Sequence, residues 1–174
     1  KQERILKDLL PNLSGIPVDN FNDTMTNFVY ISDKLKEFYP RTYARLTKLF
    51  NEMDIEWGEI EGTKDIWIRD YMPIQISDDR FIVYNYNPDY LKDSGEDYLT
   101  DSRSIADGIL NHSNKSQYDI TLDGGNVVTC AGHLVLTDKV FQENGKEKYD
   151  PDFCDYISHV LDSRIIFLSW HCDN

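Results

Sequence analysis

The chain of 174 residues has few cysteines, an excess of acidic over basic residues and no long hydrophobic run. Cys130, Cys154 and Cys172 form no CxxC pair or metal-ligand spacing, which argues against a disulfide scaffold and against a zinc site. Lysine and arginine number 18 against 31 aspartates and glutamates, so the net charge of −13 would repel nucleic acid and anionic membranes. No apolar run reaches the roughly 18 residues of a membrane span, and the first ten residues lack the apolar core of a signal peptide. We therefore expect a cytoplasmic protein with no nucleic-acid or membrane partner; the acidity either attracts a cationic substrate or serves solubility alone.

Apolar periodicity predicts an α/β chain. Helices are expected at Leu35–Met53, Asp101–His112 and Asp152–Asp162. Strands are expected at Asn27–Ile31, Asp54–Ile60, Asp65–Ile76, Arg80–Tyr86, Tyr118–Leu122, Asn126–Cys130, His133–Leu136 and Arg164–Trp170. Pairs of strands alternate with helices, and this ββαβ rhythm predicts repeated α/β units packed side by side. Because an apolar strand leads straight into the last four residues, we expect residues 1–174 to be the truncated N-terminal portion of one domain.

The first candidate site is the segment Asp65–Pro73, DIWIRDYMP. As a regular strand it would place Asp70 on one face with three apolar side chains. A carboxylate in that setting needs a positive partner, and a bound guanidinium would supply charge-assisted hydrogen bonds. Alternatively, Asp70 pairs with Arg69 or with a backbone donor. Trp67 offers a flat ring for a cation, but it shares a pocket with Asp70 only if the strand bends between them.

The second candidate site is the segment Leu122–Asn126, LDGGN, between two β-rich runs. Its residue types are those of a tight hairpin turn. Alternatively, Gly124 and Gly125 let the backbone approach a ligand closely, while Asp123 orients a catalytic imidazole. The pattern leaves both interpretations open.

Four segments together resemble the agmatine deiminase and bacterial peptidylarginine deiminase family. They are DIWIRDYMPIQ, YNYNPDYL, LDGGNVV and LTDKVFQEN, in this order within residues 54–170. The resemblance implies the pentein fold, an α/β propeller of five ββαβ blades with the active site in its central channel. This chain would supply about half of that propeller.

The resemblance also implies roles for single residues. The catalytic residues would be Asp70, which grips the substrate guanidinium, and Asp123, which supports the catalytic histidine. The expected substrate-binding residues are Trp67, Asp70, Gly124, Gly125 and Asn126. His171 and Asp173 look like the family's His-x-Asp pair but lack its flanking glycines. We therefore expect the true pair and the nucleophilic cysteine beyond Asn174, and no turnover by this chain alone.

The implied activity is hydrolysis of a guanidino group to a ureido product and ammonia through a Cys-thiouronium intermediate. The substrate would be agmatine, on a route to putrescine, or the arginine side chain of a peptide. No metal or organic cofactor is expected. The expected macromolecular partner is a second copy of the chain or the missing C-terminal half. Two alternatives remain: a noncatalytic propeller that only binds, and a relative of the amidinotransferases.

Overall fold

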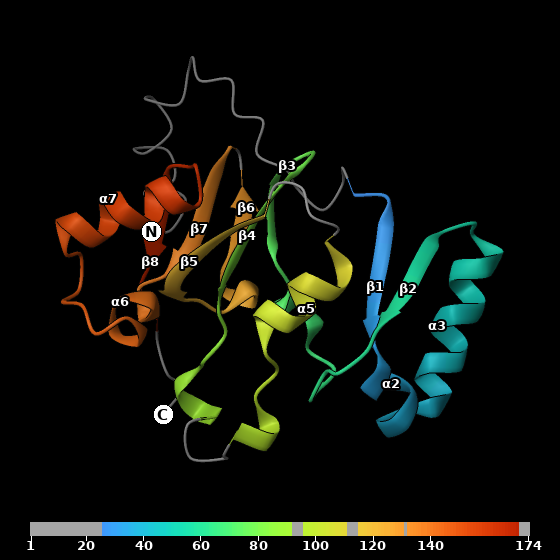
Figure 1. Ribbon diagram of the computed structural model, residues 1–174. Helices are drawn as coiled ribbons and strands as arrows, with labels where there is room; N and C mark the ends of the chain where they lie inside the picture. The colour runs from blue at the N-terminus through green and yellow to red at the C-terminus, as the bar shows by residue number, and fades with distance from the viewer. Residues whose placement is uncertain (1–25, 92–95, 111–114, 131, 171–174) are drawn as a thin grey trace, which may run out of the picture.

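The computed structural model describes residues 26–91, 96–110, 115–130 and 132–170. In these ranges the chain forms three small sheets that lie side by side, with helices packed against them (Figure 1). The strands are β1 (Phe28–Ser32), β2 (Glu56–Ile60), β3 (Ile74–Ser77), β4 (Arg80–Asn85), β5 (Lys115–Thr121), β6 (Val128–Cys130), β7 (His133–Thr137) and β8 (Ile165–Leu168). The helices are α2 (Asp33–Phe38), α3 (Pro40–Glu52), α4 (Ile68–Tyr71), α5 (Ser102–Ile109), α6 (Lys139–Glu143) and α7 (Pro151–Val160), with 3-10 turns η2 (Asp89–Leu91), η3 (Glu96–Tyr98) and η4 (Gly124–Asn126).

Two of the sheets repeat one topology. Strands β3 and β4 pair antiparallel, and β5 returns after α5 to lie parallel to β4. Strands β6 and β7 pair antiparallel in the same way, and β8 returns after α7 to lie parallel to β7. The third sheet consists of β1 and β2, which are parallel and joined through α2 and α3. The predicted ββαβ repeat is therefore confirmed in two units, whereas the five-bladed propeller stays a prediction.

Local sequence signals explain where the helices begin. The Asp101 side chain caps α5 by accepting a hydrogen bond from the Arg103 backbone N–H at 3.0 Å. The Asp150 side chain caps α7 in the same way, and Pro151 occupies the first helical position, where no N–H is needed. The predicted long helix over residues 35–53 is split into α2 and α3, because Pro40 starts a new helix after Tyr39. In the described part of the chain, no helix is both long and apolar enough to cross a membrane.

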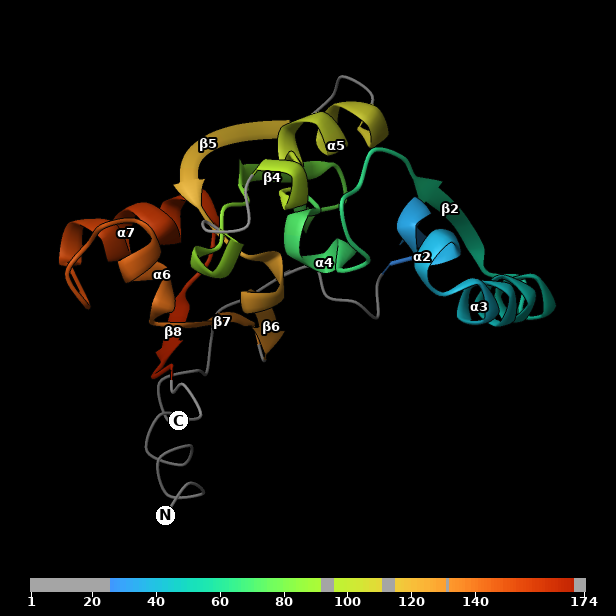
Figure 2. The same cartoon turned by 90° about the horizontal axis from the view of Figure 1, so that it is seen from below.

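The hydrophobic core lies between the two complete ββαβ units. It is built from strand residues of both units and from the inner faces of α5, α6 and α7. Phe141 of α6 is buried against the rings of Phe153 and Phe167, with centroid distances of 5.5 and 4.8 Å. Seen from below, α3 and α7 lie at opposite ends of the molecule, and α4 lies between them (Figure 2). This arrangement places α4 near the middle of the described structure.

The prediction of one strand over Asp65–Ile76 was wrong. The middle of that segment forms the single helical turn α4, and β3 begins only after Pro73. Buried tyrosines hold the turn: the Tyr71 hydroxyl donates to the Asp65 backbone oxygen at 2.9 Å, and the Tyr84 hydroxyl donates to the Asp70 backbone oxygen at 2.7 Å. These side-chain donors satisfy carbonyl groups that a sheet ladder would otherwise pair, and packing contacts thus override the alternating pattern.

The helix α6 was not predicted. It has five residues, too few for a helical period to stand out in the sequence. It ends at Glu143 with Asn144 as its C-cap. The next residue, Gly145, has a φ of +63°, the left-handed conformation that follows many helices and that glycine adopts without strain.

Candidate functional site

The two aspartates predicted from separate motifs, Asp70 and Asp123, lie next to each other. Asp70 is on α4, and Asp123 directly precedes η4, which packs against α4. A β-carbon placed on Gly125 would lie 2.5 Å from the Asp70 Oδ1 atom and 3.1 Å from the Asp123 Oδ1 atom. The two carboxyl groups therefore converge over the same glycine, and we call them the acid pair.

Burial and the negative charge of Asp123 disfavour the charged form of the Asp70 carboxyl group. The pKa of Asp70 is raised to about 7, first by burial and then by the negative charge of Asp123 and a hydrogen bond to its carboxyl group. The charge of Arg69 lowers this pKa but does not offset the other effects. The Asp70 carboxyl group therefore keeps its proton to a higher pH than an ordinary aspartate does.

The Arg69 side chain forms hydrogen bonds with two backbone carbonyl oxygens at η4. Its guanidinium donates to the carbonyl oxygens of Gly124 and Val127, at 3.3 and 3.1 Å. These hydrogen bonds tie α4 to η4 and so help to fix the distance between the two motifs. The charge of Arg69 lowers the pKa of Asp70, which still remains above its usual range.

The two glycines permit the close approach of α4 and η4. A β-carbon on Gly124 would collide with the Arg69 backbone oxygen and would lie 2.5 Å from the Tyr84 hydroxyl oxygen. Gly124 thus contacts protein backbone on the side where a side chain would be. Gly125 faces the acid pair and is exposed. Of the two, only Gly125 is placed to let a ligand approach the carboxylates, and its role in substrate binding stays a prediction.

The interpretation of LDGGN as a tight hairpin was wrong. The strands on either side of it, β5 and β6, belong to different sheets, so the segment links the two ββαβ units. Asp123 still caps the local turn, since its Oδ1 atom accepts a hydrogen bond from the Gly125 N–H at 2.8 Å. Asn126 also has a structural bond, because its side-chain oxygen accepts from the Thr137 N–H at 2.9 Å. This bond connects η4 to the end of β7.

Trp67 lies at the start of α4, and its side chain is 67% exposed. The sequence interpretation placed it opposite Asp70 on a strand, and the helical turn removes that difficulty. The Asp70 N–H donates to the Trp67 backbone oxygen at 2.9 Å, which brings residues three apart in sequence to the same side of the turn. The ring is exposed and belongs to the same helical turn as Asp70, and its role in covering a ligand stays a prediction.

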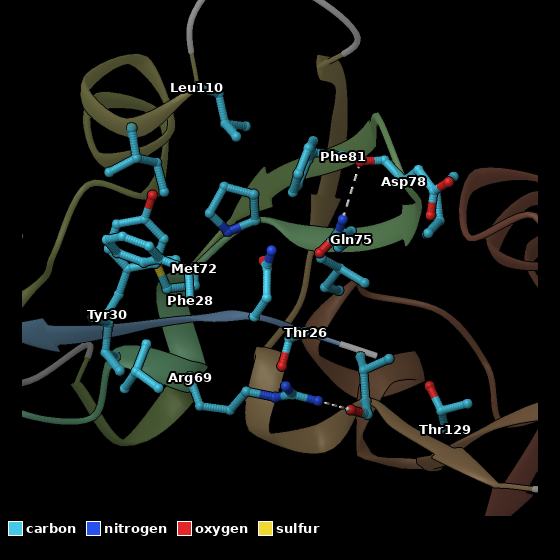
Figure 3. A pocket seen from close by; sticks show the side chains of 18 of the residues that line it. Thr26, Phe28, Tyr30, Arg69, Met72, Gln75, Asp78, Phe81, Leu110 and Thr129 are labelled. Carbon is cyan, nitrogen blue, oxygen red and sulfur yellow. Dashed lines mark hydrogen bonds between the residues drawn. The ribbon is translucent and has the colours of Figure 1, made fainter. Parts of the chain in front are cut away.

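A groove of about 740 Å³ opens on the other side of α4 (Figure 3). Its walls are mainly apolar, with Phe28 and Tyr30 of β1 facing Met72 and Phe81, and Arg69 reaching toward Val127 along one edge. Neither aspartate of the acid pair lines it. A guanidinium needs anionic partners, so the groove is not the proposed site despite its size.

Sequence reasoning missed several tyrosines around the acid pair. The Tyr84 hydroxyl donates to the backbone oxygens of Asp70 and Met72, at 2.7 and 3.0 Å, and fixes the end of α4. Tyr86 packs edge-on against Tyr71 and shares a 3.0 Å hydrogen bond between hydroxyl groups with Tyr90. Three of these tyrosines belong to the motif YNYNPDYL, so the sequence did mark the segment. Their roles could not be predicted, because they depend on contacts with residues distant in sequence.

No convincing nucleophile faces the acid pair in the part of the chain that the structure describes. Cys130 ends β6 and is exposed. Cys154 packs against the core on α7, and burial raises the pKa of its thiol, the opposite of what a nucleophilic cysteine requires. Cys172, and the pair His171 and Asp173 that looks like the family's His-x-Asp motif, lie outside the described residues. Among the described residues, no group of three or more histidine, cysteine, aspartate or glutamate side chains is arranged to hold a metal ion.

Comparison with known proteins identifies the fold. No protein-family model matches the sequence, and no curated protein matches it. Among solved structures, the agmatine deiminase of C. jejuni matches with a TM-score of 0.55 at 14% sequence identity. The match covers 89% of this chain and 55% of that protein, so the chain spans about half the length of that enzyme. The family resemblance in the sequence is thus confirmed at the level of structure: the chain has an α/β fold with mixed sheets like that of C. jejuni agmatine deiminase.

Proposed function

We propose that the acid pair binds a guanidinium group and that the chain is the substrate-binding part of a guanidine deiminase. The observation that carries the proposal is the convergence of the Asp70 and Asp123 carboxyl groups over Gly125. Burial, and then the charge of Asp123, raise the pKa of Asp70 to about 7. A bound guanidinium would replace the proton on Asp70, because its planar N–H groups donate to two carboxylates at once. The fold shared with an agmatine deiminase supports the same conclusion.

Deimination needs a thiolate in addition to the binding site. In the proposed reaction a cysteine sulfur attacks the guanidinium carbon, the carbon–nitrogen bond to one amino group breaks, and that group leaves as ammonia after gaining a proton. Water then displaces the sulfur and leaves the ureido product. Because the described cysteines are poor candidates, we propose that the nucleophile comes from outside residues 26–170, as half of a larger propeller would require.

Binding can be tested without turnover. We expect methylguanidine to bind the chain in isothermal titration calorimetry and to release protons at pH 6, where Asp70 is protonated in the free protein. Measurements in two buffers of different ionisation enthalpy give the number of protons released. Affinity should rise with pH through about 7, as the Asp70 carboxyl loses its proton.

Asp70→Asn should lower the affinity by about tenfold to a hundredfold, which corresponds to the loss of one charge-assisted interaction. Asp155→Asn is the matched control, because Asp155 is an exposed aspartate on α7 outside the acid pair. The proposal is wrong if methylguanidine fails to bind at pH 8, or if Asp70→Asn and Asp155→Asn bind it equally well.

A further inference from the structure

A second group of charged and aromatic side chains lies around Lys139, the first residue of α6. The Lys139 side chain is only 14% exposed. Its Nζ atom lies 2.8 Å from the Asp89 Oδ1 atom and 3.1 Å from the Glu143 Oε1 atom. Glu143 is itself 2% exposed in its side chain, so this ammonium is enclosed by carboxylates and largely withdrawn from water.

Two aromatic rings complete the enclosure. The Lys139 Nζ atom lies 5.5 Å from the ring centre of Tyr90 and 5.3 Å from that of Trp170. The Trp170 backbone N–H donates to the Asp138 side chain at 2.9 Å, which holds Trp170 beside the start of α6. Carboxylates combined with ring faces are the chemistry by which proteins bind ammonium groups. We call Asp89, Tyr90, Glu143 and Trp170 the ammonium cage.

Direct contacts connect the ammonium cage to the elements that carry the acid pair. The Tyr90 hydroxyl shares a 3.0 Å hydrogen bond with that of Tyr86, whose ring packs against Tyr71 of α4. The N–H of Thr137, two residues before Lys139, donates to the Asn126 side chain of η4 at 2.9 Å.

Tyr90, which forms one wall of the cage, has its pKa raised by burial and also by the negative charges of Asp123 and Asp70. The pKa of Glu143 is raised mainly by burial, with the charge of Asp123 among the further causes. The charges of the acid pair therefore act on residues of the ammonium cage, and a ligand bound at the acid pair would lie next to the cage.

We propose that Lys139 fills an ammonium subsite beside the acid pair and thereby excludes guanidines that carry a second positive charge. The inference rests on the proposed function of the acid pair and names its substrate class: guanidines with an uncharged far end, such as an arginine side chain within a peptide. With the cage occupied, a second ammonium would find no free carboxylate there and would be repelled by Lys139. Lys139 is thus a specificity-determining residue and not a catalytic one.

Two ligands of equal length test the proposal. Agmatine carries an ammonium at its far end, and pentylguanidine carries a methyl group in the same position. We expect the protein to bind pentylguanidine about tenfold more tightly than agmatine, since a desolvated cation contact is worth roughly one order of magnitude in affinity. The net charge of −13 by itself favours agmatine, which carries two positive charges, so tighter binding of pentylguanidine would have to come from Lys139. Equal affinities, or tighter binding of agmatine, would overturn it without recourse to any variant.

Lys139→Met vacates the cage while keeping a side chain of similar length. We expect this variant to bind agmatine more tightly than pentylguanidine, a reversal of about tenfold or more. Lys115→Met is the control, because Lys115 pairs with Asp107 at the surface, away from the cage, and its loss changes the net charge equally. An unchanged preference in a folded Lys139→Met protein would overturn the proposal.

Butylammonium separates this inference from the proposed function, because it has no guanidinium. It should bind Lys139→Met and not the unaltered protein, whether or not guanidines bind at the acid pair. If guanidines fail to bind but butylammonium enters the vacated cage, the proposed function is wrong and the cage is real. If butylammonium binds Lys139→Met and the unaltered protein equally, the ammonium subsite does not exist.

Discussion

The raised pKa of Asp70 predicts that the acid pair destabilises the folded protein as the pH rises. The folded state retains the Asp70 proton up to about pH 7, whereas the unfolded chain releases it near the usual value of 3.8. Between these values the folded state binds more protons, so the free energy of unfolding falls with increasing pH. Stability from this group is greatest below the unfolded pKa and is lost as the pH rises through about 7.

The magnitude follows from the size of the shift. A difference of about 3 pKa units corresponds to about 4 kcal/mol at 1.36 kcal/mol per unit. Asp70 is only partly buried, and solvent screening reduces this figure to about 1–2 kcal/mol. We therefore expect the acid pair to lower the free energy of unfolding by about 1–2 kcal/mol between pH 5 and pH 8.

Asp70→Asn isolates this effect, because the asparagine side chain does not titrate. Urea unfolding followed by tryptophan fluorescence, at pH 5 and pH 8 and constant ionic strength, should show a smaller pH-dependent loss in this variant than in the unaltered protein. Asp155→Asn, on the exposed side of α7, should keep the full loss. If Asp70→Asn loses as much stability between the two pH values as the unaltered protein, the carboxyl groups do not interact as described.

Two further predictions concern the packing that brings the acid pair together. Gly124→Ala should destabilise the protein by about 1–3 kcal/mol in thermal unfolding, since the added β-carbon collides with the Arg69 carbonyl. Gly108→Ala, whose β-carbon would meet open space on α5, should be neutral or stabilising by up to about 1 kcal/mol, and equal effects of the two changes would refute the packing argument. Tyr84→Phe should cost about 1–3 kcal/mol because two buried carbonyl oxygens lose their donor, as measured by denaturant titration. Tyr156→Phe on the exposed face of α7 should change stability little, and a similar loss there would show that the Tyr84 hydrogen bonds are not the cause.

Several elements were predictable because their signals are local. Pro40 and Pro151 mark helix starts, and the caps Asp101 and Asp150 precede helices with a clear apolar stripe. The alternation of strand pairs with helices predicted the ββαβ units, which the strand pairing confirms. The observed element boundaries differ from the predicted ones by a few residues; β5, for example, begins at Lys115, whereas the predicted strand begins at Tyr118.

The candidate site was predictable only as two separate motifs. Asp70 and Asp123 stood out as residue types in suggestive contexts, but neither motif indicates that the other lies beside it. Their convergence depends on the hydrogen bonds of Arg69 across to η4 and on the lack of a side chain at Gly124. The ammonium cage around Lys139 was not predicted at all, since its members come from η2, α6 and the residue pair after β8.

The amino-acid sequence by itself determined the α/β class, the repeated ββαβ order and the identity of the two aspartates, because these follow from periodicity, capping and motifs within short segments. Tertiary structure decided that Asp65–Ile76 turns into α4 instead of continuing as a strand, since Tyr71 folds back onto the Asp65 carbonyl and Tyr84 of β4 donates to that of Asp70. It also decided that the acid pair forms and that its pKa rises, because burial and the approach of like charges exist only once the chain has folded.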